Sequence, residues 1–211
     1  MRLAMTVVRF AVGTLVAAAV AATLIDTVAR TGAVNPFNFF GYFTVQSNLL
    51  LAAVLLLSGL PLRGPWAVAL PYARAAVTVY VVIVGLVYAT LLAPLGQAGG
   101  VPVPWANTVL HIVTPIYVVL DWALVPDRPP LDWRRIWVIL LYPAVWVAVV
   151  LIRGASDGWV PYPFLAPTQG YVVVAVYCLV IFAIALAIGA LAWWVTRWRG
   201  PLPGLSGSRR S

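Results

Sequence analysis

Charged residues are scarce in this chain, and two kinds are missing. Its 211 residues contain no lysine and no glutamate, only 9% are charged, and 64% are hydrophobic. Soluble domains carry roughly a quarter charged residues, so this chain has too little polar surface to cover a water-soluble globule. Arginines give it a formal net charge of +8, but they flank apolar runs instead of forming the basic patch of a nucleic-acid-binding protein. The composition therefore predicts an integral membrane protein and no nucleic-acid partner.

The absent and singly represented residues exclude several kinds of cofactor. Without lysine, no retinal Schiff base can form. His111 is the only histidine, so neither two-histidine haem ligation nor a multi-histidine zinc site can be built within the chain. Cys178 is the only cysteine and provides neither a disulfide nor a cysteine metal site. We therefore expect no cofactor and no metal.

Six apolar stretches are long enough to cross a membrane. A spanning helix needs about 20 mainly apolar residues, because each residue rises about 1.5 Å across a hydrocarbon core of about 30 Å. The stretches are residues 7–28, 39–60, 72–92, 105–125, 136–152 and 170–195. Proline, glycine and asparagine separate them, and these residues end helices. The predicted fold is an all-α bundle of six transmembrane helices over residues 1–200, followed by a disordered cytoplasmic tail over residues 201–211.

The arginines predict the orientation of this bundle, because cytoplasmic flanks collect positive charge. Only Arg30 and Arg153 fall on one side of the six stretches. The other side holds Arg2, Arg9, Arg63, Arg74, Arg128, Arg134, Arg135, Arg197, Arg199, Arg209 and Arg210. We therefore expect a multi-pass protein of the cell membrane, in bacteria the inner membrane, with both termini in the cytoplasm.

Two polar clusters lie within the apolar stretches. The first contains Thr44, Ser47 and Asn48, which share one helical face at spacings of three and four residues. The second contains Asn107 and His111, one turn apart. In the expected orientation both clusters begin spans that run inward from outside, and Thr44 and His111 both lie roughly 8 to 9 Å below the outer boundary. The two side chains are therefore expected to reach each other. Pro115 cannot donate to the carbonyl of His111, so a kink is expected there.

A threonine and a histidine at the same depth are suited to nucleophilic catalysis. Histidine can take the hydroxyl proton while threonine attacks an ester. Hydrogen bonds to the developing oxyanion could come from Ser47, Asn48, Asn107 or Arg153. The hypothesis is a hydrolase of a membrane lipid or fatty-acyl ester, with Thr44 as nucleophile and His111 as base.

The sequence is also compatible with two other functions. In a proton-coupled transporter, His111, Asp26 and Asp121 would carry protons along a central path. In a noncatalytic scaffold that binds lipid or protein, the two clusters would lie too far apart to touch. Structural partners are also expected for the acidic residues: Arg30 for Asp26, and Arg74 or Arg128 for Asp121.

Several motifs resemble the androgen-induced and androgen-dependent transmembrane protein family, whose bacterial branch consists of small six-helix proteins. The longest is FFGYFTVQSNLL at residues 39–50. The others are His111-Ile112-Val113-Thr114-Pro115 followed by Asp121, Tyr142-Pro143, Arg153-Gly154 and Tyr162-Pro163-Phe164. The likeness extends from Phe39 to Tyr171.

The resemblance implies an activity and two residues for it. Animal members of the family are atypical threonine hydrolases that cleave esters of fatty acids with hydroxy fatty acids, using one threonine and one histidine. In this sequence those residues would be Thr44 and His111. The same pair follows independently from depth in the membrane.

Overall fold

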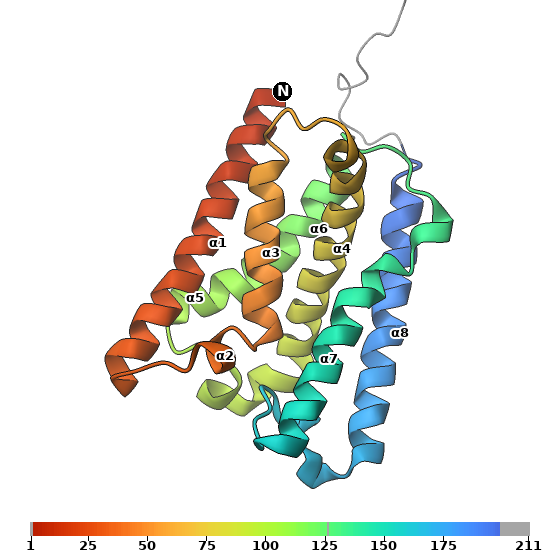
Figure 1. Ribbon diagram of the computed structural model, residues 1–211. Coiled ribbons are helices and arrows are strands. Elements are labelled where there is room, and N and C mark those ends of the chain that lie inside the picture. Colours follow the sequence, from red (N-terminus) through yellow and green to blue (C-terminus); the bar gives the residue numbers. More distant parts are fainter. Residues whose placement is uncertain (1, 126, 199–211) are drawn as a thin grey trace, which may run out of the picture.

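The computed structural model describes residues 2–125 and 127–198, and all regular structure in them is helical (Figure 1). The longer elements are α1 (Arg2–Thr31), α3 (Phe43–Leu57), α4 (Pro65–Val87), α6 (Thr114–Leu124), α7 (Val138–Ser156) and α8 (Tyr171–Val195). The shorter ones are α2 (Pro36–Phe39), η1 (Tyr88–Leu92), η2 (Ala93–Gly99), α5 (Pro104–Thr108), η3 (Val109–Val113), η4 (Trp133–Arg135), η5 (Pro163–Leu165) and η6 (Pro167–Gln169). The tail expected over residues 201–211 lies outside the described part.

Five helical stretches are long and apolar enough to cross a membrane: Leu3–Thr31, Pro65–Gly96, Pro104–Leu124, Trp133–Ser156 and Tyr171–Val195. Each overlaps one of the predicted spans. The second predicted span, residues 39–60, differs, because its regular helix is the 15-residue α3. At about 1.5 Å per residue α3 is shorter than a bilayer core of about 30 Å.

The start of α3 differs from the prediction for a local reason. Asn35 caps the short helix α2 by accepting hydrogen bonds from the backbone N–H groups of Phe37 and Asn38, and Pro36 occupies its first turn. A turn at residues 40–42 separates α2 from α3. Thr44 is therefore the second residue of its helix rather than the fifth or sixth.

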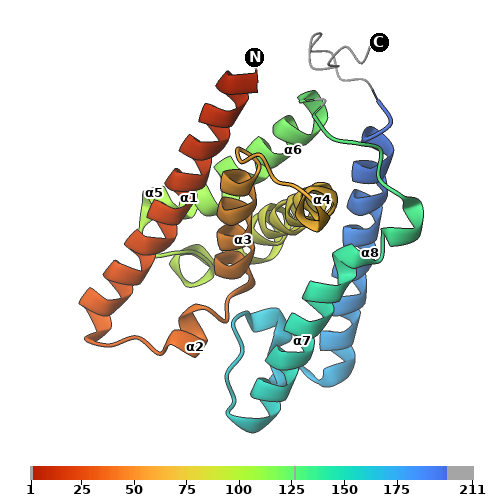
Figure 2. The same ribbon diagram turned by 45° about the horizontal axis from the view of Figure 1, so that its top comes forward.

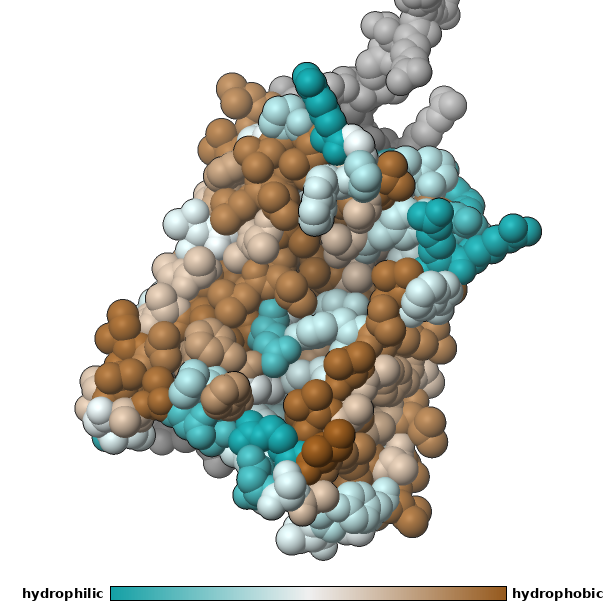
Figure 3. Space-filling view, viewed as in Figure 1, coloured by the Kyte–Doolittle hydropathy of each residue, from teal (hydrophilic) through white to brown (hydrophobic). Residues whose placement is uncertain are grey.

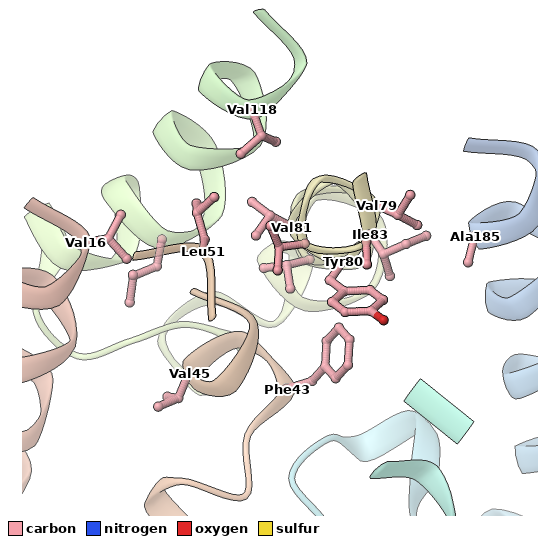
Figure 4. Packing of buried hydrophobic residues seen from close by; sticks show 14 of the residues in the cluster. Val16, Phe43, Val45, Leu51, Val79, Tyr80, Val81, Ile83, Val118 and Ala185 are labelled. Carbon is pink, nitrogen blue, oxygen red and sulfur yellow. The ribbon is translucent and has the colours of Figure 1, made fainter. Parts of the chain in front are cut away.

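Helix α4 lies at the centre of the bundle. Figure 2 looks nearly along α4 and shows α3, α6, α7 and α8 around it, with α1 beyond α3. Its buried residues include Val79 and Val81, which are fully inaccessible. Figure 4 shows the apolar packing around α4, with Phe43 of α3 pointing toward Tyr80; their ring centroids are 5.9 Å apart.

The fourth stretch widens locally before Pro115. The segment before Pro115 is η3, a π-helical turn, so the fourth stretch continues from Pro104 to Leu124 through a bulge instead of stopping. Close packing is retained here because Gly85 of α4 faces Pro115, whose ring atoms would lie 2.8 Å from any Cβ at position 85. A kink was expected at Pro115, and the structure has a π-helical turn before it.

The two ends of the bundle are polar and its sides are apolar. Figure 3 shows hydrophilic side chains gathered at the top and the bottom, with mainly hydrophobic surface between them. The top is the end where α1 begins, and the bottom holds α2 and the 157–170 loop. Exposed apolar side chains on α7 and α8, such as Val145, Ile152 and Leu179, cover the sides. This distribution is that of a membrane protein.

Candidate active site

The first turn of α3 positions Thr44. Tyr42 precedes the helix in an extended conformation and its side chain makes no capping bond, so the first N–H groups of α3 need partners from elsewhere. The N–H of Thr44 donates to the phenolic oxygen of Tyr162 at 3.1 Å. The Thr44 side chain is buried, and because Thr44 is the second residue of α3, it lies at the positive end of the α3 dipole.

His111 lies on the π-helical turn η3, and its ring faces Thr44. The Nε2 atom is 3.5 Å from Thr44 Oγ1. The Nδ1 atom is 3.2 Å from the backbone oxygen of Asn107. A carbonyl oxygen can only accept, so Nδ1 carries the proton and Nε2 presents its lone pair to the threonine hydroxyl. This tautomer is the one that a base for Thr44 needs.

Tyr88 and Asn107 fix the plane of the His111 ring. The rings of Tyr88 and His111 stack with centroids 4.2 Å apart and an interplanar angle of 20°. The Asn107 amide donates to the Tyr88 hydroxyl at 2.7 Å and its Oδ1 accepts from the N–H of Val101 at 2.9 Å. Asn107 therefore orients the His111 ring through Tyr88 and through its own backbone carbonyl. Its side-chain amide is already occupied by the bonds to Tyr88 and Val101.

Tyr162 completes the hydrogen-bond chain and comes from the loop between α7 and α8. Its hydroxyl is 3.2 Å from Thr44 Oγ1. Because it accepts from the Thr44 N–H, it can donate its own proton to Thr44 Oγ1, which in turn donates to His111. Burial raises the pKa of Tyr162 to about 12, although hydrogen bonds with Thr44 act in the opposite direction. The phenol therefore keeps its proton at neutral pH.

The role of Tyr162 was not predicted from the sequence. Its loop returns to the mouth of the bundle only through tertiary packing, and the phenol stacks on Phe164 with centroids 5.3 Å apart. The sequence signal for Tyr162 was the Tyr162-Pro163-Phe164 motif, which is among the motifs that carry the family resemblance but had no role assigned to it.

Asn48 ties α3 to the fourth stretch, and Ser47 bonds within α3. The Asn48 amide donates to the carbonyls of Thr44 and Leu110 at 2.9 and 3.3 Å, and its Oδ1 accepts from Thr114 Oγ1 at 3.0 Å. Ser47 donates to the Thr44 carbonyl at 3.3 Å. Both are fully buried, and the bonds of Asn48 to Leu110 and Thr114 connect the helices that carry Thr44 and His111.

Arg153 lies apart from the pair, at the end of α7. It forms an ion pair with Asp157 at 2.8 Å, donates to Asn38 Oδ1 at 2.8 Å, and its guanidinium lies 4.2 Å from the ring centroid of Trp159. Arg153, Asp157 and Trp159 line an outer groove that does not include Thr44 or His111. Of the four oxyanion candidates, Ser47, Asn48, Asn107 and Arg153, none lines the cavity next to the pair.

A cavity of about 500 Å³ opens beside Thr44 and His111. Its wall contains the polar residues Thr23, Thr27, Thr31, Asn35, Asn38, Tyr42 and Tyr162. A second, narrow and almost wholly apolar cleft reaches Thr44 from between α4, α7 and α8. The pair therefore has access to space on two sides.

The acidic residues considered for proton transport lie elsewhere. Asp26 pairs with Arg30 at 2.9 Å on α1, as expected. Asp121 belongs to a buried cluster at the opposite end of the bundle, paired with Arg74 at 3.0 Å, as expected, and also with Arg9 at 2.9 Å. Asp127 joins both arginines. Asp121 thus has two cationic partners and lies at the other end of the fourth stretch from His111.

The site brings together a buried threonine hydroxyl, an oriented imidazole and a buried phenol, an arrangement that suits acyl transfer. Within the described residues no group of three histidine, cysteine or acidic side chains is placed to hold a metal ion. No protein-family model, curated protein or solved structure matches this chain. The function is therefore inferred from the geometry of the site.

Proposed function

We propose that this protein is an intramembrane hydrolase of a lipid ester, with Thr44 as nucleophile and His111 as general base. The observation that carries the proposal is the 3.5 Å approach of His111 Nε2 to Thr44 Oγ1, together with the Asn107 carbonyl that keeps the proton on Nδ1. A buried threonine next to the lone pair of an imidazole is placed for proton removal during attack.

The reaction has two balanced stages. Thr44 Oγ1 attacks the ester carbon while its proton passes to His111 Nε2, and the collapsing intermediate expels the alcohol, which takes that proton. An acyl-threonine remains. Water then attacks the acyl carbon, gives a proton to His111, and releases the fatty acid as Thr44 regains its proton. No cofactor enters either stage.

Tyr162 is the best-placed oxyanion donor. Its hydroxyl and the N–H of Thr44 lie next to Thr44 Oγ1, so both can donate to an oxygen on the carbon that Oγ1 attacks. The positive end of the α3 dipole acts in the same direction. The proposal therefore assigns this role to Tyr162 and the Thr44 N–H, and leaves Ser47, Asn48 and Asn107 with positioning roles.

The proposal includes a placement in the membrane. We take α3, extended by α2 and the turn at residues 40–42, as a sixth crossing beside the five long helices. The arginine-rich end, where α1 begins, then faces the cytoplasm with both termini, and Thr44 and His111 lie in the outer leaflet of a bacterial inner membrane. A lipid ester would enter sideways from that leaflet. The resemblance to the androgen-induced and androgen-dependent transmembrane protein family supports the same activity.

Hydrolysis of a fluorogenic fatty ester by the purified protein in detergent tests this function. Thr44→Ala and His111→Ala are expected to lose at least about 100-fold in kcat. Thr78→Ala, a buried threonine of α4 bonded only to the carbonyl of Arg74, is the matched control and should retain activity. A wild-type rate no higher than that of Thr44→Ala would overturn the proposal.

A further inference from the structure

Thr44 lies in a wall between two spaces that differ in polarity: one is almost wholly apolar, and the other also exposes hydroxyl and amide groups. Thr44, Leu92 and Tyr162 line both the apolar cleft and the polar cavity. His111 lines only the polar cavity. An ester whose carbonyl carbon lies at Thr44 therefore extends one half into each space.

The apolar cleft suits a fatty acyl chain. Residues from α4, α7 and α8 form its walls, among them Tyr80, Val84, Val147, Ile181 and Ala185. Burying methylene groups along such walls is favourable, and a narrow cleft selects an unbranched chain. The outer faces of α7 and α8 are apolar and exposed, so a chain can enter the cleft from the bilayer.

The polar cavity has hydroxyl and amide groups among apolar residues in its wall, and no charged side chain lines it. Thr23, Thr27 and Thr31 follow one another at every fourth position of α1, and each hydroxyl donates to the carbonyl one turn before it at 2.7 to 2.8 Å. Their oxygens keep lone pairs that can accept from a ligand. Arg30 and Arg153 are close in sequence to residues of the cavity wall. Arg30 is paired with Asp26, and Arg153 is paired with Asp157.

The direction of the ester follows from the position of His111. The leaving alcohol must take its proton from Nε2, so the alcohol half lies in the polar cavity and the acyl half lies in the cleft. A carboxylate on the alcohol half would enter a space without a cation, which is unfavourable. Hydroxyl groups would instead donate to the threonine oxygens.

We propose that the substrate is a fatty acyl ester of an uncharged polyol, with the acyl chain in the α4–α7–α8 cleft and the polyol in the cavity next to α1. A monoacylglycerol has this chemistry. This inference depends on the proposed hydrolase function, and it differs from the carboxylate-bearing esters that the family resemblance implies.

The first experiment compares three esters of one fatty acid: a monoacylglycerol, an ethyl ester and an ester with a hydroxy fatty acid. We expect kcat/KM for the monoacylglycerol to exceed that for the carboxylate-bearing ester by at least about tenfold. Equal or faster cleavage of the carboxylate-bearing ester overturns the substrate assignment and leaves the hydrolase proposal standing. Rates for all three no higher than those of Thr44→Ala overturn the hydrolase proposal itself.

Two pairs of variants test the two spaces separately. Thr27→Val is expected to raise KM for the monoacylglycerol several-fold and leave the ethyl ester unchanged, whereas Thr90→Val, which removes an equivalent hydroxyl bonded to Leu86, changes neither. Equal effects of Thr27→Val on both esters contradict the polyol assignment.

For the cleft, Ala185→Leu fills space next to the acyl chain and should shift the preference toward shorter chains. Ala183→Leu adds the same atoms on the exposed face of α8 and is the control. An unchanged chain-length profile in folded Ala185→Leu protein contradicts the cleft assignment.

Discussion

The hydroxyl oxygen of Thr44 and the Nε2 atom of His111 lie 3.5 Å apart, although 67 positions separate the two residues in the sequence. Neither residue is held in place by its own helix alone. Asn48 ties α3 to the carbonyl of Leu110, and Tyr88 stacks on the imidazole. The pair is therefore part of a rigid network, which is what preorganised catalysis needs.

Removing the Tyr162 hydroxyl should reduce the rate without weakening substrate binding. We expect Tyr162→Phe to lower kcat by about 100-fold, because one oxyanion donor is lost, while KM changes little. Steady-state kinetics on the fluorogenic ester measure both constants. Tyr177→Phe, on α8, is the control; an unchanged kcat in Tyr162→Phe would remove the donor role.

The pH dependence of hydrolysis should show no deprotonation of Tyr162 near pH 10. Burial raises the pKa of Tyr162 to about 12, so the phenol of the folded protein stays neutral until pH approaches about 12. The associated contribution to stability is complete below about pH 10 and is lost as pH rises from there through about 12. The Thr44→Ala rate, subtracted at each pH, removes spontaneous hydrolysis. A fall in rate centred near pH 10 that Tyr162→Phe abolishes would contradict the assignment.

The sequence predicted the helices better than the details of the site. Apolar length located every long helix, because it is a local property. The arginine-based orientation and the depth below the predicted span starts led us to expect Thr44 and His111 in one region. The start of α3 was wrong by several residues, since the Asn35 cap on α2 competes with apolar length. The contribution of Tyr162 depends on how the 157–170 loop folds back, which no local pattern specifies.

Asn48 is expected to matter for stability as well as for activity. Asn48→Ala leaves the Thr114 hydroxyl and the carbonyls of Thr44 and Leu110 with fewer partners in a buried site, so we expect a loss of about 1 to 3 kcal/mol in the free energy of unfolding. Thermal unfolding in detergent measures the change. Ser58→Ala, which removes a half-buried hydroxyl bonded to Val54, should cost less. Equal melting temperatures for the two variants would argue against the network.

The two acidic residues of the transmembrane helices should respond differently to neutralisation. Asp121 is buried between Arg9 and Arg74, and removing its charge leaves buried arginines short of a partner, at a cost of about 3 to 5 kcal/mol. Asp26 pairs with the exposed Arg30, so Asp26→Asn should cost less than about 1 kcal/mol. Comparison of Asp121→Asn with Asp26→Asn by thermal unfolding checks this, and the reverse order would contradict it.

Labelling with a fluorophosphonate tests the nucleophile most directly. The probe reacts with an activated hydroxyl, and mass spectrometry of the digested protein locates the adduct. We expect one adduct on Thr44 in the wild-type protein and none in folded His111→Ala, because the threonine hydroxyl is unreactive without its base. An adduct on another residue, or hydrolytically active protein that stays unlabelled at Thr44, would contradict the central claim.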